Sequence, residues 1–208
     1  MNVVCENLGK RFQYNWIIRN CNWRFDAGNI IGIAGGNGTG KSTLIKLLSS
    51  HLSPSQGNIS YFSKGKKLDH LALYPSLSLV GPYTSLIQEY NIKEQFNFHF
   101  SFKSLLFDFS FEEFLQILDY PGYENKTIEN YSSGMHQRLQ LALAVLSKTE
   151  LLLLDEPTSF LDVDAKKWFY LLLEKYRGKR TIIIASNDQD DLLICDTIKE
   201  ITALKATV

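Results

Sequence analysis

Short continuous apolar runs recur along the chain, and segments with helical spacing separate them. The runs cover residues 29–34, 151–154 and 181–186. Such runs predict strands buried on both faces, as in a parallel sheet. Helical spacing follows the first run from Thr43 to about Ser53-Pro54, where proline disfavours further helix, and recurs over about 135–147 and 164–177. Strands alternating with helices favour an α/β fold with a mainly parallel sheet.

The N-terminal part of the chain does not follow this alternation. Residues 1–27 contain short alternating pieces that predict antiparallel strands, ending at the turn Asp26-Ala27-Gly28. A further strand candidate follows at 58–62. We therefore expect an N-terminal antiparallel β subdomain beside the parallel sheet.

The middle of the chain is dense in Phe, Leu, Asp and Glu over residues 84–120. Apolar positions between 105 and 118 recur at roughly helical spacing, which predicts a helical subdomain over about 84–135. Every second residue from Phe96 to Phe102 is a phenylalanine, as in a strand, whereas 91–94 resembles a helix start. Both structures remain open for that segment. The whole chain, 1–208, is expected to form one domain around this insertion.

Composition narrows the class of protein. Lys+Arg and Asp+Glu are each 22, so the formal net charge is zero and no nucleic-acid partner is expected. The three cysteines are scattered without a C-x-x-C pair, and the histidines show no metal-ligand spacing. No apolar run reaches the length of a membrane span. These observations favour a cytoplasmic protein.

A glycine-rich loop lies between the first apolar run and the helix that follows it. It reads Gly35-Gly36-Asn37-Gly38-Thr39-Gly40-Lys41-Ser42-Thr43 and fits G-x-x-x-x-G-K-[ST]. Backbone N–H groups and the helix N-terminus of such a loop converge on phosphate oxygens. Lys41 is predicted to reach the β- and γ-phosphates, and Ser42 to offer its hydroxyl to Mg²⁺. The alternative is a chance glycine-rich turn, but the flanking strand and helix favour a nucleotide triphosphate site.

Two carboxylates, Asp155 and Glu156, follow the apolar run 151–154. Ligands of open α/β sheets lie beyond the carboxyl ends of the strands. Asp155 is therefore predicted to face the Mg²⁺ held by Ser42 through water. Glu156 is predicted to lie near the γ-phosphate as the base that polarises the attacking water. The alternative is an ordinary Asp-Glu pair at a strand end.

Three further motifs occur in the order of a known family. They are the aromatic Phe12, the segment Tyr131-Ser132-Ser133-Gly134-Met135, and Phe160-Leu161-Asp162 after the carboxylates. With the phosphate loop, they resemble the ATP-binding cassette family over essentially the whole chain. The resemblance implies a P-loop NTPase core. It also implies that Phe12 stacks on adenine, although a core role for Phe12 remains open.

The segment from Tyr131 resembles the family's L-S-G-G-Q signature. The resemblance implies that two cassettes pack head to tail and enclose two ATP molecules. Ser132, with the backbone N–H groups around Ser133 and Gly134, would then contact the γ-phosphate of ATP bound to the partner. An ordinary helix cap uses the same geometry, so both roles can hold.

The chain departs from the family pattern at several positions. Ser133 replaces the signature's first glycine, and Met135 replaces its glutamine. A side chain at Ser133 could crowd the phosphate unless its φ is negative. The glutamine expected before the helical subdomain is missing from 79–84, and Gln88 is not expected to substitute.

Asn187-Asp188 stands where the family places its switch histidine. Asn187 can hydrogen-bond a γ-phosphate but cannot carry a positive charge near neutral pH. Since Glu156, Lys41 and Asp155 remain, we expect slow but real ATP hydrolysis, with Glu156, Lys41 and Asn187 as catalytic residues.

The resemblance implies an ATP-binding, Mg²⁺-dependent ATPase subunit that drives a separate transmembrane transporter subunit. Its partners would be a second cassette, identical or not, and that membrane subunit at the inner face of the cell membrane. One alternative is a soluble ATPase of the same superfamily. Another is a regulatory clamp with slow hydrolysis, which the changes at Met135 and Asn187 keep open. The cargo is not encoded in this sequence.

Overall fold

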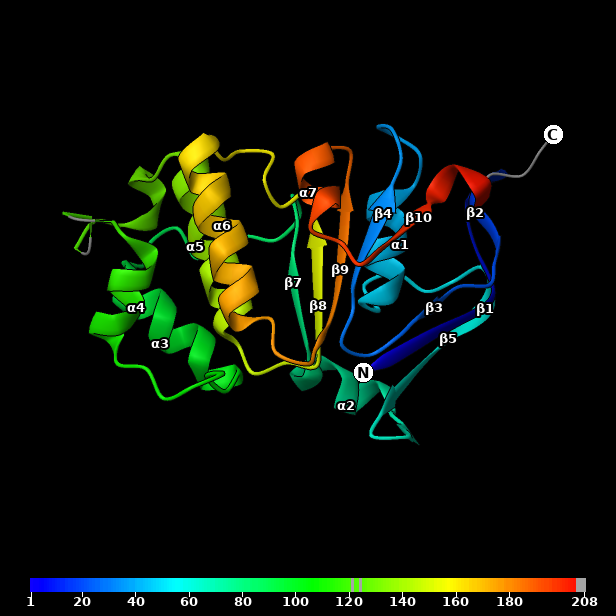
Figure 1. The fold of residues 1–208 in the computed structure, drawn as a ribbon, viewed down its shortest axis with the longest axis horizontal. Helices are drawn as coiled ribbons and strands as arrows, with labels where there is room; N and C mark the ends of the chain where they lie inside the picture. The colour runs from blue at the N-terminus through cyan, green and yellow to red at the C-terminus, as the bar shows by residue number, and fades with distance from the viewer. Residues whose placement is uncertain (121, 124, 205–208) are drawn as a thin grey trace.

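The computed structural model describes residues 1–120, 122–123 and 125–204, in which a parallel and an antiparallel sheet lie side by side (Figure 1). The parallel sheet has the order β10 (Thr197–Glu200), β4 (Ile30–Ala34), β9 (Thr181–Ser186), β8 (Leu151–Asp155), β7 (Leu77–Val80). The antiparallel sheet contains β1 (Asn2–Phe12), β2 (Asn15–Cys21), β3 (Arg24–Phe25), β5 (Gln56–Ser63) and β6 (Lys66–Lys67). The predicted parallel sheet and the predicted N-terminal antiparallel sheet are therefore both present.

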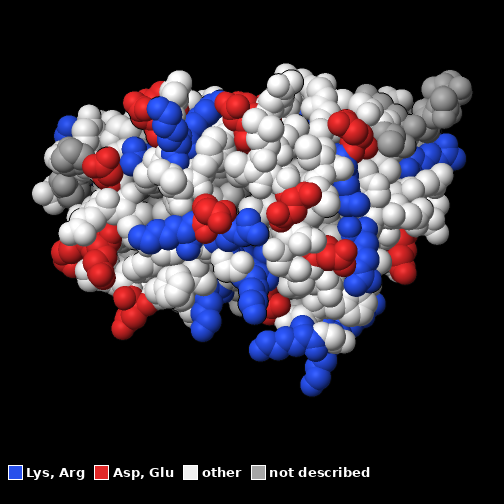
Figure 2. Space-filling view, in the orientation of Figure 1, with Lys and Arg blue, Asp and Glu red and all other residues white. Residues whose placement is uncertain are grey.

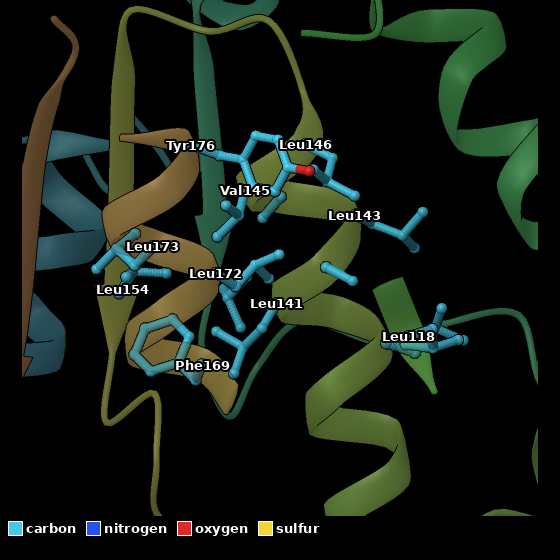
Figure 3. Close-up of a cluster of buried hydrophobic side chains, with 14 of the residues drawn as sticks. Leu118, Leu141, Leu143, Val145, Leu146, Leu154, Phe169, Leu172, Leu173 and Tyr176 are labelled. Atoms are coloured by element: carbon cyan, nitrogen blue, oxygen red, sulfur yellow. The ribbon is translucent and has the colours of Figure 1, made fainter. Parts of the chain in front are cut away.

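Side chains of the central strands alternate between two hydrophobic clusters. Leu152 and Leu154 face α5 (Ser133–Leu146) and α6 (Val163–Tyr176), as Figure 3 illustrates for Leu154. Leu151 and Leu153 face the cluster that includes α1 (Lys41–Leu48) and the antiparallel sheet. Both faces of these strands are thus covered, which is why the strands read as continuous apolar runs.

The aromatic segment around Phe96 is helical. It forms α3 (Ile92–Phe102), and Asn91 and Glu94 make a capping box at its start. The phenylalanines at alternate positions therefore point in different directions. Phe96 packs against Phe100 one turn later, at a ring-centroid distance of 4.8 Å. The helix start signal at 91–94 therefore predicts the structure of this segment correctly, and the strand alternative is wrong.

The second predicted helix of this region is shorter than its apolar spacing suggested. It forms α4 (Phe111–Leu118), again with a capping box, between Ser110 and Glu113. The preceding stretch instead runs along the core, where the N–H of Leu106 donates to the carbonyl of Leu146 at 2.8 Å. A capping residue at Ser110 thus starts the helix later than hydrophobic spacing alone predicts. Residues 121 and 124 of the proposed 84–135 subdomain lie outside the described residues.

The predicted end of the phosphate-loop helix near Ser53-Pro54 is wrong, because α1 ends at Leu48. Ser50 adopts the left-handed conformation, with φ +59, and the N–H of Leu52 donates to the carbonyl of Lys46. This closed turn terminates the helix before the proline is reached.

Several elements had no expected counterpart. They are β6, α2 (His70–Ser76), β7, η1 (Ile128–Asn130), α7 (Gln189–Leu193), β10 and η2 (Ile201–Leu204). Within the described part of the chain, no helix combines the length and apolarity needed to cross a bilayer. Basic and acidic side chains are interspersed on the face shown in Figure 2, in keeping with the zero net charge.

Candidate functional site

The glycine-rich loop joins the end of β4 to the start of α1, as predicted. Gly40 is the N-cap residue of α1 with φ +108, and a Cβ there would lie 2.9 Å from Ile17 Cγ2. Gly38 also has positive φ, at +71. The Thr39 hydroxyl donates to the carbonyl of Gly36 at 2.7 Å and tightens the turn. The glycine spacing of the motif is thus required by backbone conformation.

Lys41 is the first residue of α1, and its side chain folds back over the loop. Its Nζ donates to the carbonyls of Gly35 at 2.7 Å and Gly36 at 3.2 Å. The same ammonium lies 3.1 Å from Oε1 of Glu156. A nearly buried cation is therefore held by oxygen acceptors beside the exposed backbone of the loop.

A pocket of about 320 Å³ opens beside this ammonium. It is lined by Phe12, Ile17, Gly36, Asn37, Gly38, Gly40, Lys41, Ser42, Thr43 and Glu156. The structure thereby brings together the predicted aromatic, the phosphate loop and one of the two carboxylates. Phe12 is 47% exposed, so it is a surface residue at the pocket and not part of the core.

Asp155 ends β8 and is 1% exposed. Among the described residues, neither of its carboxylate oxygens has a hydrogen-bond partner. Burial raises the pKa of this carboxyl, and the negative charge of Glu156 raises it further. Two buried, unpartnered carboxylate oxygens beside a serine hydroxyl fit a hard divalent cation such as Mg²⁺.

Glu156 holds an unusual backbone conformation directly after Asp155, with φ +49. Its N–H donates to the carbonyl of Ala185 at 2.8 Å, which fixes this turn to the neighbouring strand β9. Its Oε2 lies 3.2 Å from the Ser186 hydroxyl oxygen and accepts from the Asn187 N–H at 3.3 Å. A left-handed non-glycine residue is strained, and such strain is concentrated at functional sites.

Asn187 lies at the end of β9, next to the phosphate loop. Its Nδ2 donates to Oδ1 of Asn37 at 3.0 Å. The structure thus brings the predicted switch position, the loop and Glu156 into direct contact. An amide at this position bonds the loop without contributing a charge.

Sequence reasoning missed a buried carboxylate behind this contact. Asp191 of α7 is 1% exposed and accepts from the hydroxyls of Ser186 at 2.7 Å, Thr158 at 3.1 Å and Tyr170 at 2.9 Å. Because the Ser186 hydroxyl also lies 3.2 Å from Glu156, Asp191 is linked to the predicted base through one side chain. The sequence signal was weak, since Asp191 is one of two adjacent aspartates in a short helix.

The residues of the signature-like segment lie outside the pocket of the phosphate loop. Ser132 is the N-cap of α5, and its hydroxyl accepts from the Met135 N–H at 3.2 Å. Ser133 is the first helical residue and is absent from the described residues with positive φ. Gly134 is close to the carbonyl of Phe160, which a Cβ would approach to 3.0 Å. Within the described part of the chain, none of Ser132, Ser133 and Gly134 lines the pocket of the phosphate loop.

The stretch that lacks a glutamine forms a tight turn after β7. Thr84 donates to the carbonyl of Gly81 from both its N–H at 2.9 Å and its hydroxyl at 2.7 Å. The Gln88 side chain donates to the carbonyl of Leu86 at 3.1 Å. The turn instead places the ring of Tyr83 beside Asp155, which sequence reasoning missed.

Comparison with known sequences gives a matching family model and several similar ATP-binding proteins. A family model described as ABC transporter matches residues 18–159. The chain is 31% identical over 198 residues to the uncharacterized ABC transporter ATP-binding protein YybJ of Bacillus subtilis, covering 93% of this chain and 89% of YybJ. Four other matching ATP-binding proteins are longer, and the chain spans 55% to 65% of their length.

Comparison with solved structures finds proteins of the same kind with a similar fold. A putative ABC transporter ATP-binding protein from Pyrococcus furiosus has a TM-score of 0.83 at 21% identity, covering 99% of this chain and 100% of that one. A bacterial ABC transporter cassette solved as a dimer has a TM-score of 0.80 at 21% identity, covering 96% of this chain and 95% of that one. These likenesses confirm the predicted α/β fold.

Proposed function

The chain belongs to the ABC transporter family, and from this premise we propose that it is the subunit that binds and hydrolyses ATP to drive a separate transmembrane subunit. The observation that carries the proposal is the pocket in which Phe12, the phosphate loop and Glu156 meet around the Lys41 ammonium. A triphosphate is the anion that such a loop, helix N-terminus and lysine bind.

Binding uses two ends of the same pocket. Phe12 offers an exposed aromatic face for adenine. Lys41 and the backbone N–H groups of 36–43 receive the phosphates, and Lys41 exchanges its contact with Glu156 for the γ-phosphate. Ser42 and Asp155 would hold Mg²⁺, which when bound supplies positive charge against the phosphate oxygens.

Hydrolysis depends on Glu156 as the base that polarises a water. Its Oε2 is fixed by Ser186 and by the Asn187 N–H, so the carboxylate is oriented before substrate arrives. Asn187 contributes a neutral hydrogen bond to the γ-phosphate where a charged side chain would stabilise the transition state further. This supports slow ATP hydrolysis, at a rate roughly tenfold to a thousandfold below that of a site with a charged side chain at this position.

A second cassette completes the site. Ser132 and the N–H groups around Ser133 and Gly134 lie exposed or half-exposed at the N-terminus of α5, away from the chain's own pocket. Backbone donors at a helix N-terminus suit the γ-phosphate of ATP held by the partner. The helical conformation of Ser133 directs its side chain away from the clash that a left-handed residue would cause.

The transmembrane subunit would dock at a hollow of about 470 Å³ formed by residues of α2, β7, α3 and α5. Apolar side chains line much of it, among them the exposed Phe102 and the half-exposed Phe98. Closure of the cassettes would move α3 and α4 together with this hollow, which couples ATP binding to the partner. The site of action is then the inner face of the cell membrane.

Two experiments test this function. The chain, expressed in its host with an affinity tag, should co-purify with a polytopic membrane protein; recovery only with soluble partners would overturn the transport role. A fluorescent ATP analogue should bind the wild-type chain and fail to bind Lys41→Ala. Lys167→Ala is a matched control, because Lys167 is an exposed lysine whose ammonium pairs with Asp164 at 3.2 Å, away from the pocket. Equal binding by wild type and Lys41→Ala would contradict the assigned site.

A further inference from the structure

The turn after β7 brings Tyr83 to the buried carboxylate of the candidate metal site. A Cβ added at Gly81 would lie 3.1 Å from Asp155 Cβ and 3.1 Å from Tyr83 Cζ, so both side chains border the same point. Glycine at position 81 therefore leaves the space through which the phenol ring reaches Asp155. Three hydrogen bonds between Gly81 and Thr84 hold the turn in this shape.

Three polar atoms at this contact have no hydrogen-bond partner among the described residues. They are the Tyr83 hydroxyl and both carboxylate oxygens of Asp155, all of them buried. A buried hydroxyl and a buried carboxylate each cost free energy when unpaired, and together they form a donor and two acceptors. The three atoms thus complement one another chemically.

A cation contacts the face of the Tyr83 ring. The Lys46 ammonium lies 4.0 Å from the ring centroid, which is within the range of a cation–π contact. A tyrosine hydroxyl is ordinarily protonated at neutral pH, so it is available as a hydrogen-bond donor. Lys46 thus contacts the face of the ring, while the hydroxyl end of the ring borders Asp155.

We propose that Tyr83 is a positioning residue of the metal site, whose hydroxyl donates to one oxygen of Asp155 and leaves the other oxygen for the Mg²⁺ shell. The inference rests on the proposed ATP-binding function. Groups that hydrogen-bond to a metal-binding carboxylate fix its orientation, and their loss typically weakens metal affinity by about 10- to 100-fold. Tyr83 then supplies an interaction with the metal side of the site in a stretch that has no glutamine.

The competing explanation is that Tyr83 only fills space under Lys46. Tyr83→Phe separates the two roles, because it keeps the ring and its contact with Lys46 and removes only the hydroxyl. Tyr61→Phe is the matched control: it also removes a buried tyrosine hydroxyl, one that donates to the carbonyl of Leu48 at 2.9 Å. Melting temperatures of all three proteins verify that each is folded.

The measured quantity is the metal concentration at half-saturation of the protein–ATP complex, with Mn²⁺ counted by electron paramagnetic resonance. Tyr83→Phe should raise it about tenfold or more, while Tyr61→Phe leaves it unchanged. Binding of a fluorescent ATP analogue in EDTA should be equal for all three. An unchanged midpoint in Tyr83→Phe, an equal rise in Tyr61→Phe, or weaker binding in EDTA for Tyr83→Phe would each overturn the inference. Wild-type protein that binds no ATP with or without metal would instead contradict the proposed function.

Discussion

Lys41 and Glu156 form an ion pair at the pocket, with Nζ 3.1 Å from Oε1 and side chains that are 6% and 23% exposed. The residue proposed to receive the phosphates and the residue proposed to polarise water therefore contact each other directly. In the proposed mechanism the Glu156 carboxylate and the γ-phosphate compete for the Lys41 ammonium. Glu156 would thus oppose ATP binding as well as promote hydrolysis.

The first prediction follows from this competition. Glu156→Gln removes the competing charge and the repulsion between the carboxylate and the γ-phosphate. We expect it to bind ATP up to about tenfold more tightly, since such an ion pair is worth on the order of 1 kcal/mol. Titration of wild type and variant with a fluorescent ATP analogue measures the difference. Weaker binding by the variant would show that Glu156 does not restrain Lys41.

Asn187 gives the second prediction. Asn187→His places a side chain that can become positively charged at a position whose side chain contacts Asn37 and whose backbone N–H contacts Glu156. We expect the rate of ATP hydrolysis to rise about tenfold or more, with little change in ATP affinity. Asn187→Ala is the control and should lower the rate while it preserves binding. A slower Asn187→His variant would contradict the assigned role.

Asp191 gives a prediction about pH. Burial raises the pKa of this carboxyl, against the opposing effect of its hydroxyl partners, and the charge of Asp188 raises it further. The folded protein thus binds this proton more tightly than the unfolded chain does. The cost of ionised Asp191 is fully present above the raised pKa and disappears as the pH falls below the ordinary value near 4.

The variant Asp191→Asn carries no such cost. Its melting temperature relative to wild type should therefore be most favourable at pH 7 to 8 and decline as the pH falls to about 4. Asp188 and Lys166 are retained in both proteins, and the charge of Asp188 is one of the causes of the raised pKa that the comparison tests. Asp190→Asn, at an exposed position on the same helix, is the control for replacing an aspartate of α7. A constant difference for Asp191→Asn would refute the raised pKa.

Arg180 gives a stability prediction away from the pocket. Its guanidinium is buried and donates to the carbonyls of Val145 at 2.5 Å, Ser147 at 3.1 Å and Tyr176 at 2.8 Å, at the ends of α5 and α6. Arg180→Met leaves these carbonyls unpaired and should lower the free energy of unfolding by about 2–4 kcal/mol. Urea denaturation measures this loss. ATP affinity below the denaturation range should not change, and a loss of less than ~1 kcal/mol would contradict the capping role.

Much of the fold was predictable because its signals are local. The strands at β4, β8 and β9 are apolar runs, and the capping boxes at Asn91 and Ser110 mark two helix starts. The end of α1 could not be predicted, because it depends on a left-handed Ser50 that no residue preference at that position announces. Short elements such as α7 and β10 form through packing against β9 and β4, which the sequence does not display.

The residues of the candidate site also fall into those that the sequence predicts and those that depend on tertiary structure. The phosphate loop and Asp155-Glu156 have fixed spacing within the chain, so their positions could be inferred from sequence. The contacts of Asn187 with Asn37 and of Asp191 with Ser186 depend on how separate strands end beside one another. Tyr83 reaches Asp155 only because a glycine turn follows β7. Such contacts follow from tertiary geometry and have no signature of their own.

The central claim is that this chain hydrolyses ATP with Glu156 as the base. The most direct test is steady-state phosphate release by the chain assembled with its membrane partner, compared with the same assembly carrying Glu156→Gln. We predict slow but measurable turnover by the wild type, and a rate at least about 100-fold lower in the variant. Phosphate release by the wild type that does not exceed that of the Glu156→Gln assembly would contradict the account.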